Sequence, residues 1–558
     1  MFEVFFYSFL ITILFTPFGV FFTDRLNISF LVYSKQQIFG LFVLSFIAVF
    51  LNFFFPLGKV LNSISIPISI LLIIYFRKNF LNLKFITFCL LNSIIVTLLI
   101  LESEVYRPDA GLYHLPYIGI LNSEKIIAGI SNLHSRYGHI SIIQYLSAYS
   151  QNILFGVNGI VFPGALIASS VIINFVYQIY KYNIKQNYNF HFFFLLFVSI
   201  YIFYKMNRYS EYGNDAPAHF LVFFLISELI LYKNKSSISD IANNLALCLF
   251  IALNKVMLVV IGLTSLLIIS KKQILSLLKN IKFVFVILFF IVYILKNIIS
   301  TGCILYPLKF TCYNNLSWVT VSEIKEISAA GEAWSKGISD LSASDKNKYL
   351  TYEDFNKNFN WVKAWSKKHL IIIIEILIPY LIFCFIVIFF ILKKGPLKKG
   401  YLKKYYINLF IILLICNIIW FLKAPLYRYG YSLIISFLSI SFALIILKFH
   451  LHKKKLFLIS NFILIFGITI LTTKNIYRIY ENTNQYYNYP WPKYYSMNGE
   501  NKKKNNFKVS YVNTQKIIIP DKGYCMYTKS LCNHYEIGSK LKLKFNNNYK
   551  VFFLLDEK

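Results

Sequence analysis

Residues 107–117 combine the side-chain types that acid–base chemistry and anion binding require. The stretch contains an arginine, an acid, a tyrosine and a histidine: Arg107, Asp109, Tyr113 and His114. It follows the apolar run 85–101. Loops carry function disproportionately often, and acids at a membrane boundary must be solvated or paired. The pattern predicts a functional site at the edge of a hydrophobic segment; the alternative is an interfacial loop that is polar because water reaches it.

Asp109 and Asp215 are the candidate catalytic carboxylates. Asp109 has the chemistry of a general base toward an acceptor hydroxyl, or of an anchor for a divalent cation. Asp215 would complete a two-carboxylate site, so a divalent metal ion is a candidate cofactor. The alternative role for Asp215 is helix capping, because an Asp before Ala-Pro is common where helices begin.

Other polar side chains beside apolar runs form the candidate substrate-binding set. Arginine is scarce here and lysine abundant, and the planar guanidinium suits phosphate and carboxylate better than an ammonium does. Arg428 is therefore a candidate ligand for a lipid phosphate, with snorkelling to the interface as the alternative. The full set is Arg107, Tyr113, His114, His134, Arg136, Arg208, Glu211, His219 and Arg428.

Two further features leave alternatives open. Four histidines, His114, His134, His139 and His219, are either metal ligands or hydrogen-bonded spectators. Lys255 interrupts an apolar run, where a lysine indicates function by default, but it also suits the tip of a hairpin.

The composition requires a membrane. The 558 residues are 57% hydrophobic with a mean hydropathy of +0.58, which a soluble protein cannot bury. Apolar runs near the length that crosses a bilayer recur along the chain, and the first, 2–22, is interpreted as a retained helix. The predicted fold class is an all-α polytopic membrane protein with about 12–14 transmembrane helices, interfacial helices in its outer loops and a small C-terminal extracytoplasmic α/β or β domain.

The predicted organisation alternates membrane regions with outer segments. Within these regions, 60–76 is one expected span, and 241–270 is either a short hairpin or one tilted helix. In chain order the regions are transmembrane helices at 1–101, a first large outer loop with interfacial helices and the candidate catalytic Asp at 102–151, transmembrane helices at 152–299, an outer loop at 300–369, transmembrane helices at 370–472, and a C-terminal extracytoplasmic domain at 473–558.

The net charge of +33 comes from lysines gathered in short loops between apolar runs. This is the positive-inside pattern. It places the acid-rich loops together on the outer face, and it requires no nucleic acid partner. Anionic membrane lipids are the expected counterions.

The larger loops and the tail differ in their residue patterns. The segment 118–151 has apolar residues at helical spacing and predicts a helix lying in the outer interface. The tryptophans of 300–369 predict a loop resting partly on the membrane, over a substrate groove. In the tail, alternation at 541–545 followed by 549–555 predicts a β-hairpin.

Two close cysteine pairs lie on the predicted outer face. An oxidising compartment would allow both to be disulfides, and zinc binding is the weaker alternative because the ligand spacing is poor. The pairs are Cys303 with Cys312 and Cys525 with Cys532.

These features together resemble the GT-C superfamily, the multi-span glycosyltransferases that use lipid-phosphate-linked sugars. In that family an acid in the first large outer loop is catalytic, and Asp109 occupies this place. A second outer acid is matched by Asp215, and a late arginine that binds the lipid phosphate in some members is matched by Arg428. The Asp-Ala-x-x-Tyr-His-Leu-Pro pattern at 109–116, with Asn-Leu-His-x-Arg at 132–136 and the tail Cys-x6-Cys, looks like an uncharacterised bacterial multi-pass family related to these enzymes.

The resemblance implies transfer of a sugar from a polyprenyl-phosphate-linked donor to a glycan, lipid or protein acceptor on the outer face of the bacterial inner membrane. The chain departs from the superfamily in having extra spans before the Asp109 loop and no Asp-x-Asp. Alternatives are an O-antigen or polysaccharide polymerase or ligase, a transporter or flippase of lipid-linked glycans, and a non-catalytic scaffold.

Overall fold

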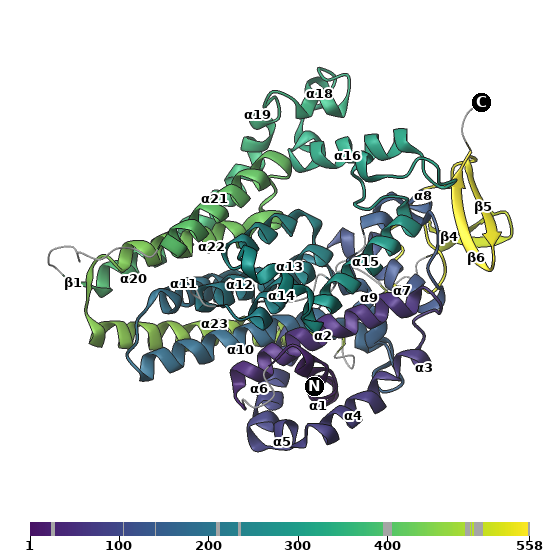
Figure 1. Ribbon diagram of the computed structural model, residues 1–558. Coiled ribbons are helices and arrows are strands. Elements are labelled where there is room, and N and C mark those ends of the chain that lie inside the picture. Colours follow the sequence, from purple (N-terminus) through teal and green to yellow (C-terminus); the bar gives the residue numbers. More distant parts are fainter. Residues whose placement is uncertain are drawn as a thin grey trace.

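The computed structural model describes residues 1–23, 28–103, 105, 107–139, 141–207, 212–232, 236–393, 404–485, 491–492, 494–495 and 506–555. Ten helices within these ranges are long and apolar enough to cross a membrane, and four shorter apolar helices accompany them. The predicted fold class is confirmed: the chain is a helical, multi-pass membrane protein (Figure 1).

The ten membrane-length helices enclose a core to which nearly every element contributes. In chain order they are α1 with η1 (Phe2–Phe15, Thr16–Phe21), α2 (Phe30–Asn52), α6 (Leu83–Ile100), η4 with α10 (Gly156–Val161, Phe162–Ile184), α12 (Asp215–Tyr232), α15 (Ile281–Thr301), α19 with η9 and α20 (Val362–Trp365, Ser366–Leu370, Ile371–Ile391), α21 (Lys404–Lys423), α22 (Tyr427–Ile446) and α23 (Lys453–Gln485).

Small polar side chains join the buried helices. Ser170 of α10 donates to Gln37 of α2 at 2.6 Å, and Asn174 donates to Ser34 at 2.8 Å. Because lipid tails compete with apolar side chains, such hydrogen bonds and close packing hold membrane helices together. α10 is accordingly the most enclosed of the ten.

The shorter helices correct one predicted span and settle another. The expected span 60–76 is divided into α3 (Lys59–Asn62) and α4 (Ser65–Tyr75), followed by α5 (Arg77–Phe80). The segment 241–270 forms α13 (Ile238–Asn254) and η5 (Val256–Leu267). Cys248 lies 3.4 Å from Ser265, so the two helices fold back on each other as a hairpin with its tip at Lys255. α11 (Phe190–Lys205), η6 (Lys271–Gln273) and α14 (Ile274–Leu278) complete this part.

The segment 118–151 is not the continuous interfacial helix that its periodicity predicted. It forms the end of α7 (Leu115–Ser123), then α8 (Ile130–Leu133), η3 (Ser135–His139) and α9 (Ile142–Ser150). All nine residues of α9 are buried. Its apolar positions face protein on every side, because α2, α10 and the C-terminal tail pack around it.

The loop 300–369 forms a small helical layer with its own core, at the top of Figure 1. Its elements before α19 are η7 (Lys309–Thr311), α16 (Val321–Ser335), η8 (Ile338–Asp340), α17 (Ala343–Lys346) and α18 (Tyr352–Asn356). Trp361 and Trp365 are buried with Phe355 in this core. Trp361 and Trp365 therefore hold this layer together, and the prediction that part of the loop rests on the membrane stays a prediction.

The tail is two hairpins packed on the membrane region. β3 (Phe507–Val512) pairs with β4 (Gln515–Pro520), and β5 (Leu541–Asn546) pairs with β6 (Tyr549–Leu554). The predicted hairpin is confirmed, and Asn547 and Asn548 make its turn with positive φ, as a two-residue hairpin turn requires. β6 hydrogen-bonds to Ala128, beside α8 (Figure 1). A further two-stranded pair joins β1 (Leu392–Lys393) and β2 (His450–Leu451).

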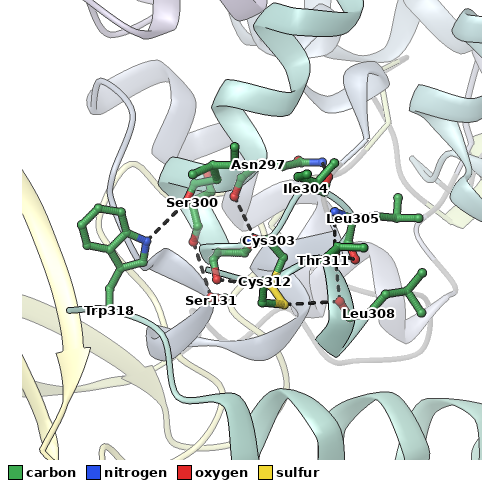
Figure 2. Close-up of a disulfide and its surroundings, with 12 residues drawn as sticks. Ser131, Asn297, Ser300, Cys303, Ile304, Leu305, Leu308, Thr311, Cys312 and Trp318 are labelled. Carbon is green, nitrogen blue, oxygen red and sulfur yellow. Dashed lines mark hydrogen bonds between the residues drawn. A yellow bond between two sulfur atoms is a disulfide. The ribbon is translucent and has the colours of Figure 1, made fainter. Parts of the chain in front are cut away.

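Both predicted disulfides, Cys303–Cys312 and Cys525–Cys532, are formed. The first closes a loop directly after α15 (Figure 2). Within that loop, the Thr311 hydroxyl donates to the carbonyl oxygen of Leu308 at 2.8 Å, and Asn297 of α15 donates to the Ile304 carbonyl oxygen at 3.0 Å (Figure 2). The loop is thereby fixed to the helix it follows.

Candidate active site

One cavity of about 1570 Å³ brings together Asp109, Asp215 and Arg428. These residues come from three parts of the chain and meet near the first turns of α12 and α22, where exposed backbone N–H groups favour anions. Four more of the predicted residues line the same cavity: Arg107, Tyr113, His114 and Arg136. These seven predicted site residues therefore line one cavity.

Asp109 is positioned by the end of α6 and by a π-helix. Arg478 of α23 donates to the carbonyl oxygens of Leu98 and Leu101 at 2.8 and 2.7 Å, so the last turn of α6 has partners for its free carbonyls. Asp109 directly precedes the π-helix η2 (Ala110–His114). Such widened turns occur frequently at functional sites, and here the turn directs both Asp109 and Tyr113 to the cavity.

The Asp109 carboxylate lies between two arginines. Its Oδ1 accepts from Arg136 at 2.9 Å, and its Oδ2 accepts from Arg428 at 2.9 Å. Burial raises the pKa of Asp109, but the positive charges of Arg428 and Arg136 outweigh burial and hold this pKa below its usual value. Asp109 is therefore an ionised carboxylate that neutralises part of a strongly cationic site.

Arg428 points into the cavity and not toward lipid. Its guanidinium lies 5.3 Å from the ring of Trp334 and 5.2 Å from the ring of Tyr429. It also donates to the Tyr429 hydroxyl at 3.4 Å. Aromatic rings and Asp109 together hold the guanidinium in one place, which is not the snorkelling arrangement that was the alternative.

The second acid, Asp215, is paired with the lysine at the hairpin tip. Asp215 is the first residue of α12, and its carboxylate accepts from Lys255 Nζ. The Lys255 ammonium also lies 4.0 Å from the centre of the Tyr429 ring. Lys255 occupies the hairpin tip, and it also lines the cavity. The Asp215 side chain is engaged with this lysine at the cavity wall.

His114 is held as a neutral imidazole. Gln144 of α9 accepts from the Ser141 backbone N–H at 3.0 Å and from its hydroxyl at 2.5 Å. The Gln144 amide group is thereby oriented to donate to His114 Nδ1, which leaves the proton on Nε2. Burial lowers the pKa of His114 to about 4. The ring is uncharged near neutral pH and presents a hydrogen-bond donor.

His219 has a different role from the predicted one of binding substrate. It is fully buried in α12, where Nε2–H donates to the Arg428 carbonyl oxygen at 2.9 Å and Nδ1 contacts the Ser432 hydroxyl at 2.6 Å. Its ring packs on Tyr431 with 3.7 Å between centroids. His219 lies behind the cavity wall and positions the backbone that carries Arg428.

The remaining predicted residues are dispersed. His139 borders the same cavity, and His134 lines a separate small pocket. Arg208 and Glu211 lie outside the described residues. Across the described part of the chain, no group of three or more His, Cys, Asp or Glu side chains could hold a metal ion. His114, His134 and His219 make separate hydrogen bonds, and His139 packs on the Tyr306 ring.

Three residues of the site carried no usable signal in the sequence. Gln144 was one polar residue in an apparently amphipathic segment, Tyr429 one of many tyrosines, and Trp334 a presumed interfacial residue. Each acts on a charged or titrating group from a distant part of the chain. Only their contacts in three dimensions reveal them.

Fold and site together define a multi-pass membrane protein whose helix ends and capping layer enclose a cavity. Its lining includes a cationic cluster of Arg107, Arg136, Arg428 and Lys255, with Asp109 and Asp215 among these cations. The chain belongs to the family described as a domain of unknown function (DUF8201), whose model matches residues 1–435 and so includes every residue of this cationic cluster. No curated protein and no solved structure matches the chain.

Proposed function

We propose that this protein is an integral membrane glycosyltransferase that moves a sugar from a polyprenyl-phosphate-linked donor to a glycan, lipid or protein acceptor. The observation that carries the proposal is the Asp109 carboxylate held between Arg136 and Arg428 in a large cavity. A carboxylate flanked by guanidinium groups supplies both a proton acceptor and phosphate ligands in one place.

The cations suit the phosphate of the donor. Guanidinium groups bind phosphate through two parallel hydrogen bonds, and ammonium groups bind it as point charges. Arg428, Arg136 and Lys255 line the cavity together. Asp109 and Asp215 balance these charges, so a donor phosphate entering the cavity would share cations that are already held in position.

The proposed reaction is an inverting displacement at the anomeric carbon. The acceptor hydroxyl oxygen forms a bond to this carbon as the bond to the phosphate oxygen breaks. The electron pair of the broken bond leaves with the polyprenyl phosphate, whose added charge Arg428 and Arg136 stabilise. The acceptor proton passes to Asp109. Because the pKa of Asp109 lies below its usual value, this transfer is favourable only once the attacking hydroxyl has become acidic in the transition state.

The site is proposed to open to the outer face of the bacterial inner membrane. Two features support this orientation: the short basic loops, which favour the cytoplasm, and the two disulfides, which require an oxidising compartment. The cavity is bordered by residues of the 303–312 disulfide loop. Donor, acceptor and phosphate leaving group would then meet on the oxidising side.

The test is donor turnover by the full-length protein in proteoliposomes. Synthetic polyprenyl phosphates carrying a radiolabelled hexose or pentose serve as donors, with extracted cell-envelope glycolipid as acceptor, and release of polyprenyl phosphate is measured. Asp109→Asn is expected to lower turnover by about 10²–10⁴-fold, the range of a general base. Asp521→Asn is the matched control, because Asp521 lies in the tail and pairs weakly with Lys508 at 4.0 Å.

The alternatives predict other outcomes. A polymerase or ligase that works without an essential carboxylate would keep its turnover in Asp109→Asn. A flippase would move the labelled donor across the bilayer without releasing polyprenyl phosphate. If wild-type protein shows no release with any donor of the panel, the glycosyltransferase proposal is wrong.

A further inference from the structure

A second, smaller pocket of about 170 Å³ adjoins the large cavity. Four residues border both spaces: Ser135, Tyr306, Ile327 and Tyr535. A water-sized group needs roughly 10–15 Å³ of such volume, so the pocket has room for about as many heavy atoms as one monosaccharide contains. It is too small for an oligosaccharide.

Two nearly buried residues of this lining, His134 and Tyr306, each carry a buried polar atom without a hydrogen-bond partner among the described residues. The Nδ1 of His134 accepts from the Arg136 backbone N–H at 3.2 Å, so the ring proton is on Nε2. This Nε2–H and the Tyr306 hydroxyl are both buried, and neither has a hydrogen-bond partner among the described residues. Both side chains are 5% exposed. A buried polar group without a partner costs free energy, so a ligand that enters beside these residues and reaches either atom would gain a favourable hydrogen bond.

The two side chains are held rigidly. Tyr306 lies inside the 303–312 disulfide loop shown in Figure 2, and its ring lies directly on Gly138, where a Cβ atom would come within 2.5 Å of it. His134 packs between Tyr137 and Tyr535, with the Tyr535 ring stacked at 5.9 Å and 20°. These positions exist before any ligand arrives, which lowers the entropic cost of binding.

The remaining lining is uncharged apart from Glu323. Asn533, Thr320 and Ser131 add amide and hydroxyl groups, and no lysine or arginine stands among the described residues of the wall. Hydroxyl-rich ligands suit such a mixture of neutral donors, one carboxylate acceptor and aromatic rings. Phosphate and carboxylate ligands do not, because Glu323 would repel them.

We propose that this pocket is the acceptor subsite and holds one uncharged sugar residue of the acceptor. The assignment rests on the proposed glycosyltransferase function and gives that function its acceptor class. The pocket wall continues directly to the reacting centre, since residues 131–135 line the pocket and the next residue, Arg136, binds Asp109. A sugar ring seated against His134 and Tyr306 extends its free hydroxyl toward Asp109, while the donor phosphate occupies the arginines.

The experiment measures the binding of simple neutral glycosides to the full-length protein in detergent by saturation-transfer NMR. The probes are the methyl glycosides of glucose, galactose and mannose, with methyl glucuronide as the charged comparison. At least one neutral probe is expected to bind saturably, and the glucuronide at least tenfold more weakly. Tyr535→Ala should weaken the neutral probe about tenfold, the value of a lost aromatic contact, whereas Tyr535→Phe should keep it.

Tyr535 is 66% exposed, so its replacement leaves the buried core unchanged. Tyr511→Ala is the matched control, because Tyr511 is equally exposed at 65% and lies in β3. Asp109→Asn should lower turnover by about 10²–10⁴-fold and leave glycoside binding intact. Glycoside binding without any donor turnover would refute the glycosyltransferase proposal and retain the subsite.

Two results would overturn the subsite itself. One is that no neutral glycoside binds saturably while wild-type protein turns over donor. The other is that binding survives Tyr535→Ala but is lost in Asp109→Asn, which would put the glycoside in the large cavity.

Discussion

α12 carries an acid paired with a lysine near each of its ends. Asp215 at its first residue pairs with Lys255, and Glu228 pairs with Lys35 at 2.5 Å. The thirteen residue steps from Asp215 to Glu228 correspond to about 20 Å of helix. At the first end, Asp215 and Lys255 line a cavity together with Arg428. At the other end, the Glu228 side chain is only 3% exposed, and it also accepts a hydrogen bond from the Tyr232 hydroxyl at 3.0 Å.

The difference shows what makes an intramembrane ion pair functional. A buried salt bridge is weak evidence for anything by itself, because desolvation offsets its attraction. The Glu228 pair joins α2 to α12, and neither of its residues lines the large cavity. The Asp215 pair lies beside further cations and open volume, so a ligand can reach it. The two ends of α12 therefore differ less in the ion pair itself than in access from the cavity and in the cations nearby.

The largest expected effect that separates the two ends concerns phosphate. Arg428→Gln should weaken binding of undecaprenyl phosphate by roughly 10- to 100-fold, because a hydrogen bond to a charged group is worth about 1.5–3 kcal/mol. Lys35→Gln should leave this affinity unchanged. Native mass spectrometry of the detergent-solubilised proteins measures both. Equal losses in the two variants would mean that phosphate binding is not a property of the cavity.

The two acids of α12 allow a matched pair of substitutions. Asp215→Asn should lower donor turnover by roughly tenfold or more, since it removes charge beside the proposed reaction. Glu228→Gln should keep turnover within about twofold and lower the free energy of unfolding by about 1–3 kcal/mol, less than for a fully buried pair because Lys35 is 27% exposed.

Turnover and thermal unfolding of the same preparations check this contrast. Loss of turnover in Glu228→Gln at unchanged stability would contradict the division of roles between the ends of α12.

A smaller effect is expected from acid. Burial, the first cause in each case, lowers the pKa of His114, His134 and His139 to about 4, against an ordinary value of 6.5. Between pH 6.5 and 4 the unfolded chain therefore binds protons that the folded chain does not, and stability falls as the pH falls. His139→Asn should make this decline shallower in unfolding curves recorded at several pH values. An unchanged slope would show that His139 titrates normally when folded.

Much of the site was predictable because membrane geometry restricts where polar residues can be. Asp109, Arg136 and Arg428 stand out as charges at the ends of apolar runs, and both disulfides follow from close spacing on one face. The pairing of Asp109 with Arg428 was beyond prediction, since 319 residues separate them. The periodicity of 118–151 was misinterpreted because a segment buried on all sides can have the same spacing as an amphipathic one.

The tail was expected to be a small C-terminal domain, but its close packing against the membrane region was not predicted. Gly111 and Gly119 explain the difference: a Cβ atom on Gly119 would come within 1.8 Å of the Thr528 backbone, and one on Gly111 within 2.5 Å of Met526. The Met526 N–H donates to the Gly111 carbonyl oxygen at 2.9 Å. Two glycines are a weak signal in a sequence, but here they mark where the tail packs against η2 and α7.

That contact has a consequence for biogenesis. Ribosomes make the helices first, and residues 524–532 follow all ten of the candidate membrane-spanning helices. During synthesis there is therefore a stage in which the helices are inserted but Gly111 and Gly119 lack the tail residues that pack against them. In the proposed orientation, the site is complete only after the tail has crossed the membrane, Cys525 and Cys532 have formed their disulfide, and the tail has docked. A translocation defect would thus leave an inserted, full-length protein with an unfinished site.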